Sequence, residues 1–102
     1  MRVQFKQWEC WLKVGYYSQG RVALVLGSDE GPVATATVNV TNEPLGEGEV
    51  CIKDYSENTG MVAALVEAGV VEAPHREVAT GFVKVPVCRL TEAARAFVEG
   101  RR

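Results

Sequence analysis

The chain has 102 residues, of which 47% are hydrophobic and 24% are charged, and its formal net charge is −2. These proportions are close to those of an average globular domain, so we expect a single domain over residues 1–102. The chain lacks the run of roughly 18 apolar residues that a membrane-spanning helix needs, and residues 1–10 lack the apolar stretch of a signal peptide. We therefore expect a cytoplasmic protein without a membrane span.

The first half of the chain has the alternation of antiparallel strands. Val3 and Phe5 are apolar at odd positions, whereas the apolar residues from Trp8 to Tyr16 stand at even positions. Because a one-residue shift exchanges the two faces of a strand, a turn or bulge at Lys6-Gln7 must separate a short first strand from the next one.

Three further strands follow. Residues 21–26 are nearly all apolar, residues 33–40 alternate, and the turns before each of them are short. Sequential strands with short turns make a meander. Residues 41–48 predict a longer loop, because they contain a proline and two glycines, and residues 49–53 predict the strand that follows it.

A helix is predicted from residue 59 or 60 to residue 68, because Met61, Leu65 and Ala68 share one face and Gly69 can end it. Its wide apolar surface should lie deep against the sheet.

Residues 82–90 predict the last long strand, which Pro86 should place at an edge or give a bulge, since proline has no NH. Thr91 then opens a short C-terminal helix. The predicted fold is α+β, with an antiparallel meander sheet of about five strands, one central packed helix and a short C-terminal helix.

Cysteine and histidine usage predicts neither a metal site nor a cofactor. The three cysteines, Cys10, Cys51 and Cys88, are widely spaced without a Cys-x-x-Cys pair, so we expect reduced, structural side chains. A zinc site needs about four ligands, and His75 is the single histidine. We expect His75 to be a solvated loop residue, because no orienting partner for a catalytic base is identifiable.

The segment from Glu49 to Met61 is the most informative part of the chain, because it joins the predicted strand 49–53 to the helix. Short oxygen-bearing side chains of this segment suit a helix cap. Capping leaves four side chains without an explanation, and we interpret them as a partner-binding epitope: Lys53, Asp54, Tyr55 and Glu57. The segment has no histidine or cysteine, so we expect no catalytic residue in it.

Two aromatic residues are further candidates for partner binding. Trp11 lies with Glu9 and Lys13 on the polar face of its strand, where it either binds a partner or is buried beneath the C-terminal helix. At the tip of the following hairpin, Tyr17 is expected to be more exposed than Tyr16.

The charges are unevenly distributed along the chain. Residues 28–57 contain seven acids and only one base, Lys53, whereas residues 1–27 have a net charge of +3 and residues 58–102 a net charge of +1. The middle segment makes either an acidic surface, which steers cationic partners and repels phosphate, or a set of solvated loops.

The run Lys53-Asp54-Tyr55-Ser56-Glu57-Asn58, followed by Gly60-Met61, resembles the signature of a small family of uncharacterised phage- and plasmid-borne bacterial proteins. Residues 36–40, 67–71 and 80–88 are similar as well, while Thr59 stands where the signature has an acid. The resemblance supplies no activity, cofactor or catalytic residue. It implies an accessory protein of a mobile element, a class that includes non-enzymatic inhibitors of host defence systems such as CRISPR effectors.

We therefore expect a non-enzymatic interaction module that binds a larger host protein through its acidic surface. One alternative is a small-ligand enzyme or sensor with its site at the junction of residues 53–60. Another is a nucleic-acid-binding accessory protein that uses the basic residues 1–27 with Trp11 and Tyr17, which the acidic pI disfavours.

Overall fold

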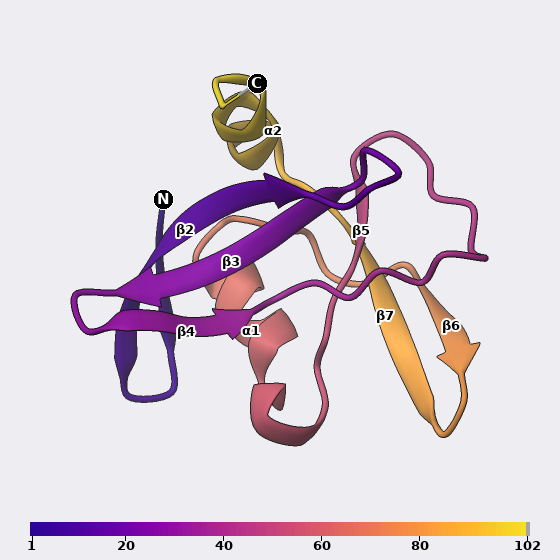
Figure 1. The fold of residues 1–102 in the computed structure, drawn as a ribbon, viewed down its shortest axis with the longest axis horizontal. Helices are drawn as coiled ribbons and strands as arrows, with labels where there is room; N and C mark the ends of the chain where they lie inside the picture. The colour runs from indigo at the N-terminus through magenta and orange to yellow at the C-terminus, as the bar shows by residue number, and fades with distance from the viewer. Residues whose placement is uncertain (102) are drawn as a thin grey trace.

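The computed structural model describes residues 1–101, which fold into two antiparallel sheets and two α-helices (Figure 1). The first sheet is a meander of β1 (Arg2–Phe5), β2 (Trp8–Tyr16), β3 (Val22–Ser28) and β4 (Gly31–Thr35). The second has the order β5-β7-β6, with β5 (Glu49–Cys51), β6 (Arg76–Thr80) and β7 (Val83–Arg89). The helices are α1 (Met61–Glu67) and α2 (Glu92–Glu99), and a 3-10 turn, η1 (Ser56–Asn58), precedes α1.

The α+β class is confirmed, but two separate sheets replace the single predicted meander of about five strands. The change of sheet occurs inside the predicted strand 33–40. β4 ends at Thr35, after which the Ala36 NH donates to β3 at 2.8 Å and the Val38 NH donates to β5 at 3.1 Å. Residues 35–38 are called the connecting segment below, because they bond to both sheets.

Pro86 lies in the central strand of the second sheet, so its predicted position at an edge or bulge is wrong. The strand tolerates the proline because β5 ends opposite it. The Ile52 NH donates to the Pro86 carbonyl at 2.9 Å, and proline has no NH with which to return the bond. Cys51 is accordingly the last residue of β5.

The turn between β1 and β2 lies at Lys6 and Gln7, where the phase of the apolar pattern predicted it. Lys6 adopts a left-handed conformation with φ +54°, which turns the chain tightly enough for Phe5 to pair with Trp8. The turn restores the phase, so the inward residues of both strands share one buried face: Val3, Phe5, Cys10 and Leu12.

Both helices form where the sequence predicts them. α1 buries Met61 and Leu65, and the chain turns away after it at Gly69, whose φ of +74° lets the Val70 NH reach the Leu65 carbonyl at 2.9 Å. Thr91 caps the start of α2, because its Oγ1 accepts from the Ala94 NH at 3.1 Å. Neither helix within residues 1–101 is long and apolar enough to cross a membrane.

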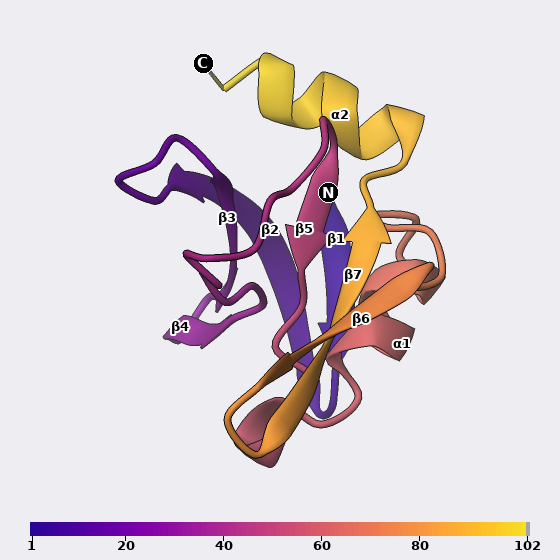
Figure 2. The same cartoon turned by 90° about the vertical axis from the view of Figure 1, so that its right-hand side faces the viewer.

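The larger core cluster lies on the inner face of the first sheet, where both helices and the second sheet contribute side chains. Figures 1 and 2 show α1 on one side of this sheet and α2 across one end of the molecule. A smaller cluster covers the opposite face of the second sheet around Cys51, Val85 and Val87. The outer face of the first sheet keeps the exposed positions of β1 and β2, because these alternate with the buried ones.

The three cysteines are free and buried, as expected. Burial raises the pKa of the Cys10 and Cys51 thiols, and it raises the pKa of Cys88 to about 11. All three are therefore protonated thiols at neutral pH, which are poor nucleophiles.

We predict that Leu65→Ala lowers the free energy of unfolding by about 2–5 kcal/mol, because the side chain is fully buried and its removal leaves a cavity. The neighbouring variant Val66→Ala is the control, since Val66 is 40% exposed on the other side of α1 and should change stability by less than about 0.5 kcal/mol. Urea unfolding measures both. Equal losses in the two variants would contradict the packing of α1.

Candidate functional site

Asp54 holds the start of α1. Its Oδ1 accepts from the Gly60 NH at 2.7 Å and its Oδ2 accepts from the Val62 NH at 3.2 Å. These are amides that a helix leaves without a partner at its N-terminal end. Asp54, which we interpreted as part of the partner-binding epitope, therefore has the geometry of a helix cap.

The junction is also tied to the connecting segment. The Asn58 side chain is 2% exposed, and its Nδ2 donates to the Thr35 carbonyl at 2.8 Å. The Lys53 NH donates to the Ala36 carbonyl at 2.8 Å. The polar run after β5, residues 53–60, therefore connects the two sheets and α1, and it is called the joint below.

Lys53, Tyr55 and Glu57 lie together on the surface of this joint. Lys53 Nζ is 2.6 Å from Glu57 Oε1, and this bond lowers the pKa of Glu57 and raises the pKa of Lys53. The same Nζ lies 5.7 Å from the centroid of the Tyr55 ring, which packs against the smaller core cluster. Lys6 reaches across from the first sheet and donates to the Glu57 carbonyl at 2.6 Å.

Trp11 stands on the outer face of the first sheet, with 48% of its surface exposed. Its cross-strand neighbours are Arg2 and Gly27. The Arg2 guanidinium lies 4.4 Å from the ring centroid and bonds to the Glu9 carboxylate at 2.6 Å, whereas Gly27 has no side chain to cover the ring. α2 packs against the larger core cluster instead, so exposure is confirmed and burial beneath α2 is not.

The expected exposure of Tyr17 is wrong, because Tyr16 is the more exposed of the pair at 42%. The Tyr17 hydroxyl lies 2.9 Å from Oγ1 of Thr37, which is buried in the connecting segment. Tyr17 is thus linked to the joint through this segment, while Trp11 belongs to the outer face of the first sheet.

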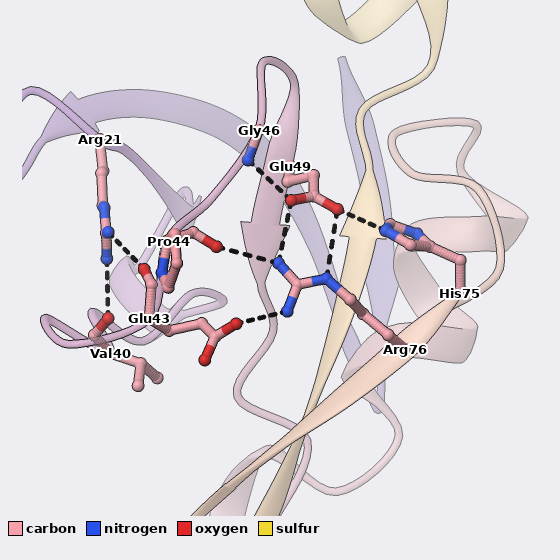
Figure 3. Close-up of polar contacts among 8 residues, drawn as sticks. All are labelled: Arg21, Val40, Glu43, Pro44, Gly46, Glu49, His75 and Arg76. Carbon is pink, nitrogen blue, oxygen red and sulfur yellow. Dashed lines mark hydrogen bonds and ion pairs between the residues drawn. The ribbon is translucent and has the colours of Figure 1, made fainter.

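A polar cluster that the sequence did not predict joins β5 to β6 (Figure 3). Glu49 Oε1 accepts from Arg76 Nη2 at 3.0 Å and from the Gly46 NH at 2.7 Å, and its Oε2 lies 2.5 Å from His75 Nε2. Arg76 also bonds to the Glu43 carboxylate at 2.6 Å. His75, which we expected to be a solvated loop residue, therefore has a carboxylate partner.

Glu49 is nearly buried, with 9% of its side chain exposed. The Arg76 guanidinium is the largest cause of a low pKa at Glu49, and the Gly46 NH and His75 add to it, so the pKa falls from 4.5 to about 2. The two carboxylates of Glu49 and Glu43 in turn raise the pKa of Arg76.

A second arginine holds the loop between the connecting segment and β5. Arg21 donates to the Val40 carbonyl at 2.7 Å and to the Glu43 carbonyl at 2.5 Å, while Arg76 donates to the Pro44 carbonyl at 3.1 Å (Figure 3). The predicted loop 41–48 is therefore fixed from both sheets. These contacts give the cluster a bracing role.

Ion pairs offset part of the negative charge of residues 28–57, because three bases, Lys53, Arg76 and Arg95, pair with acids of this segment. Within residues 1–101, four of the seven acids of this segment have a basic partner, and Asp54 accepts two backbone NH groups. The other two, Asp29 and Glu30, lie in the exposed turn between β3 and β4. The field of a continuous acidic surface is correspondingly reduced.

One hollow in the surface lies beside the joint. An open hollow of about 420 Å³ between β1 and α1 is lined by polar and apolar residues in equal part, among them Lys6, Thr59 and Glu67, and the four epitope residues of the joint are not in its lining. Another of about 340 Å³ lies between loop 45–48 and α2. Its arginines, Arg21 and Arg95, are engaged with carbonyl groups and with Glu47.

Within the described residues 1–101, His, Cys, Asp and Glu side chains do not gather in a group of three that could hold a metal ion. Comparisons of the chain with protein-family models, with curated proteins and with solved structures found no match.

We predict that Asp54→Ala lowers the free energy of unfolding by about 1–2 kcal/mol, because two amides at the start of α1 lose their acceptor. Glu57→Ala is the control, since it removes an exposed ion pair that is worth less than about 1 kcal/mol. Urea unfolding separates them. An Asp54→Ala variant as stable as the wild type would contradict the capping role.

We predict that Glu49 makes folding sensitive to acid. Because its pKa is lowered in the folded state from 4.5 to about 2, its stabilising contribution is complete above pH 4.5 and is lost as the pH falls toward 2. Unfolding measured between pH 7 and pH 2 should show a smaller loss of stability in Glu49→Gln than in the wild type. Glu47→Gln, whose carboxylate is 88% exposed, should retain the wild-type slope. A wild-type slope in Glu49→Gln would overturn this assignment.

Proposed function

We propose that the protein is a binding module without enzymatic activity, from a mobile genetic element, that occupies a surface on a larger host protein. Its context comes from the resemblance to phage and plasmid proteins, and inhibition of a host defence system such as a CRISPR effector is the consequence we propose. The observation that carries the proposal is Trp11, 48% exposed on an open sheet face. Tryptophan and arginine are the side chains most enriched among the residues that dominate binding energy.

The surroundings of Trp11 favour a role in binding over chance exposure. Arg2 is fixed between the indole ring at 4.4 Å and the Glu9 carboxylate at 2.6 Å. Side chains that are ordered before binding lose less entropy when a partner arrives. Gly27, on the other side, carries no side chain, and the end of the Lys13 side chain lies over it.

We assign the contact to the outer face of the first sheet and not to an acidic surface, because four of the seven acids of residues 28–57 are held in ion pairs. Lys53, Tyr55 and Glu57 remain secondary candidates for partner binding, because the Lys53 side chain already contacts the other two. Groups that could support catalysis have structural partners as well. The thiols are protonated, and the Glu49 carboxylate is occupied by Arg76 and the Gly46 NH.

The proposal is tested with a host CRISPR effector loaded with guide RNA. We predict that the protein binds the effector and prevents binding of labelled target DNA, and that Trp11→Ala weakens the binding at least about 30-fold, as expected for a central aromatic residue. Phe82→Ala is the matched control, because Phe82 is a fully exposed aromatic on another element and should change affinity less than about twofold.

Binding by interferometry and DNA recognition by fluorescence anisotropy give separate readouts. No binding to effector complexes, or equal losses in the two variants, would contradict the proposal. Retention of single-stranded oligonucleotides that is lost in Trp11→Ala would assign the outer face to nucleic acid instead.

A further inference from the structure

The second sheet has an open edge at β6. β6 neighbours only β7 in the sheet, and Figure 1 shows it at the periphery of the molecule, on a hairpin that projects from the body. The other three edges are protected. β1 lies beside α1, β4 contains Pro32, and β5 is continued by the bond from the Val38 NH to the Cys51 carbonyl. An unprotected edge strand offers its NH and carbonyl groups to another strand.

The register identifies the backbone groups at this edge. Because the Pro86 carbonyl accepts from Ile52, the backbone of Pro86 faces β5, and alternate residues of β7 face β6. Val85 is one of them, and it pairs with Val78. The NH and carbonyl groups of Val78 therefore point toward β7. Those of its two neighbours in β6, Glu77 and Ala79, point away from the sheet.

We propose that a second copy of the chain pairs with this edge, so that two β6 strands run antiparallel about a two-fold axis at Val78. In this register, Glu77 of each copy lies opposite Ala79 of the other, and each pair exchanges both NH···O bonds. The two three-stranded sheets become one continuous sheet. A register centred on Glu77 would place two like charges opposite each other, which is unfavourable.

The side chains on one face fit this arrangement. Val78 is half-buried and packs against the smaller core cluster. At the two-fold axis it meets Val78 of the second copy as a non-hydrogen-bonded pair, the type in which side chains approach more closely. The clusters of the two copies thereby join.

The charges on the other face complement each other. Glu77, Ala79 and Lys84 share this face, and Lys84 pairs with Ala79 in the register of the hairpin. Across the small side chain of Ala79, Glu77 of one copy faces Lys84 of the other over two strand spacings, about 10 Å between Cα atoms, which the two long side chains can span. Within residues 1–101, neither Glu77 nor Lys84 has an ion pair.

Sedimentation of the full chain tests the dimer. We predict a mass that rises with concentration from 11.1 kDa toward twice that value, over a range that extends to about 1 mM because small interfaces are weak. Ala79→Pro removes an NH that points away from the sheet, so the variant should keep the fold, verified by thermal unfolding, and remain a monomer. Ala79→Ser keeps the NH and should dimerise like the wild type.

Charge variants test the register. Glu77→Lys and Lys84→Glu should each weaken self-association about tenfold, because attraction between the copies becomes repulsion. A mixture of the two variants should restore self-association, since opposite charges face each other in a dimer that contains one copy of each variant. A monomeric wild type over the whole range, a dimer of Ala79→Pro as strong as that of the wild type, or a mixture no stronger than either variant would overturn the proposal.

Discussion

The connecting segment, residues 35–38, is the contact on which the rest of the structure depends. The Ala36 NH bonds to the first sheet and the Val38 NH to the second, while Thr37 between them is 3% exposed. Thr37 Oγ1 accepts from the Leu24 NH at 3.2 Å and lies 2.9 Å from the Tyr17 hydroxyl, so its buried hydroxyl is satisfied. Two small sheets that would each be marginal alone are thereby joined around one core.

The sequence predicted most elements but not the partners of the strands. Apolar alternation and cap residues depend on neighbours in the chain, which is why α1, α2 and the turn at Lys6 lie where they were expected. Alternation over residues 33–40 continues through the point where the chain changes sheets, because alternation reports which side is buried and not which strand is bonded. The position of Pro86 was predicted wrongly for a related reason. Whether its missing NH costs a hydrogen bond depends on where the neighbouring strand β5 ends.

The candidate site was predictable only where it is local. Asp54 stands in a run that suits capping and bonds to amides within that run, whereas Asn58 of the same run bonds to the distant Thr35 carbonyl. Arg76 and Glu49 are 27 residues apart, and no pattern in the sequence connects them. The exposure of Trp11 depends on the position of α2, and the contact of Tyr17 depends on the path of the connecting segment, so neither could be read from its own strand.

The residues of the joint and the outward residues around Trp11 differ in how much of the fold depends on them. Asp54, Asn58 and the NH of Lys53 connect parts of the architecture, so a change at them is felt in α1 and in both sheets. The outward side chains around Trp11 hold no other element in place, because they stand on the solvent side of a sheet whose core lies behind it. Substitutions on this face should therefore leave the fold intact, whereas substitutions at Asp54 or Asn58 loosen the contact between α1 and the two sheets.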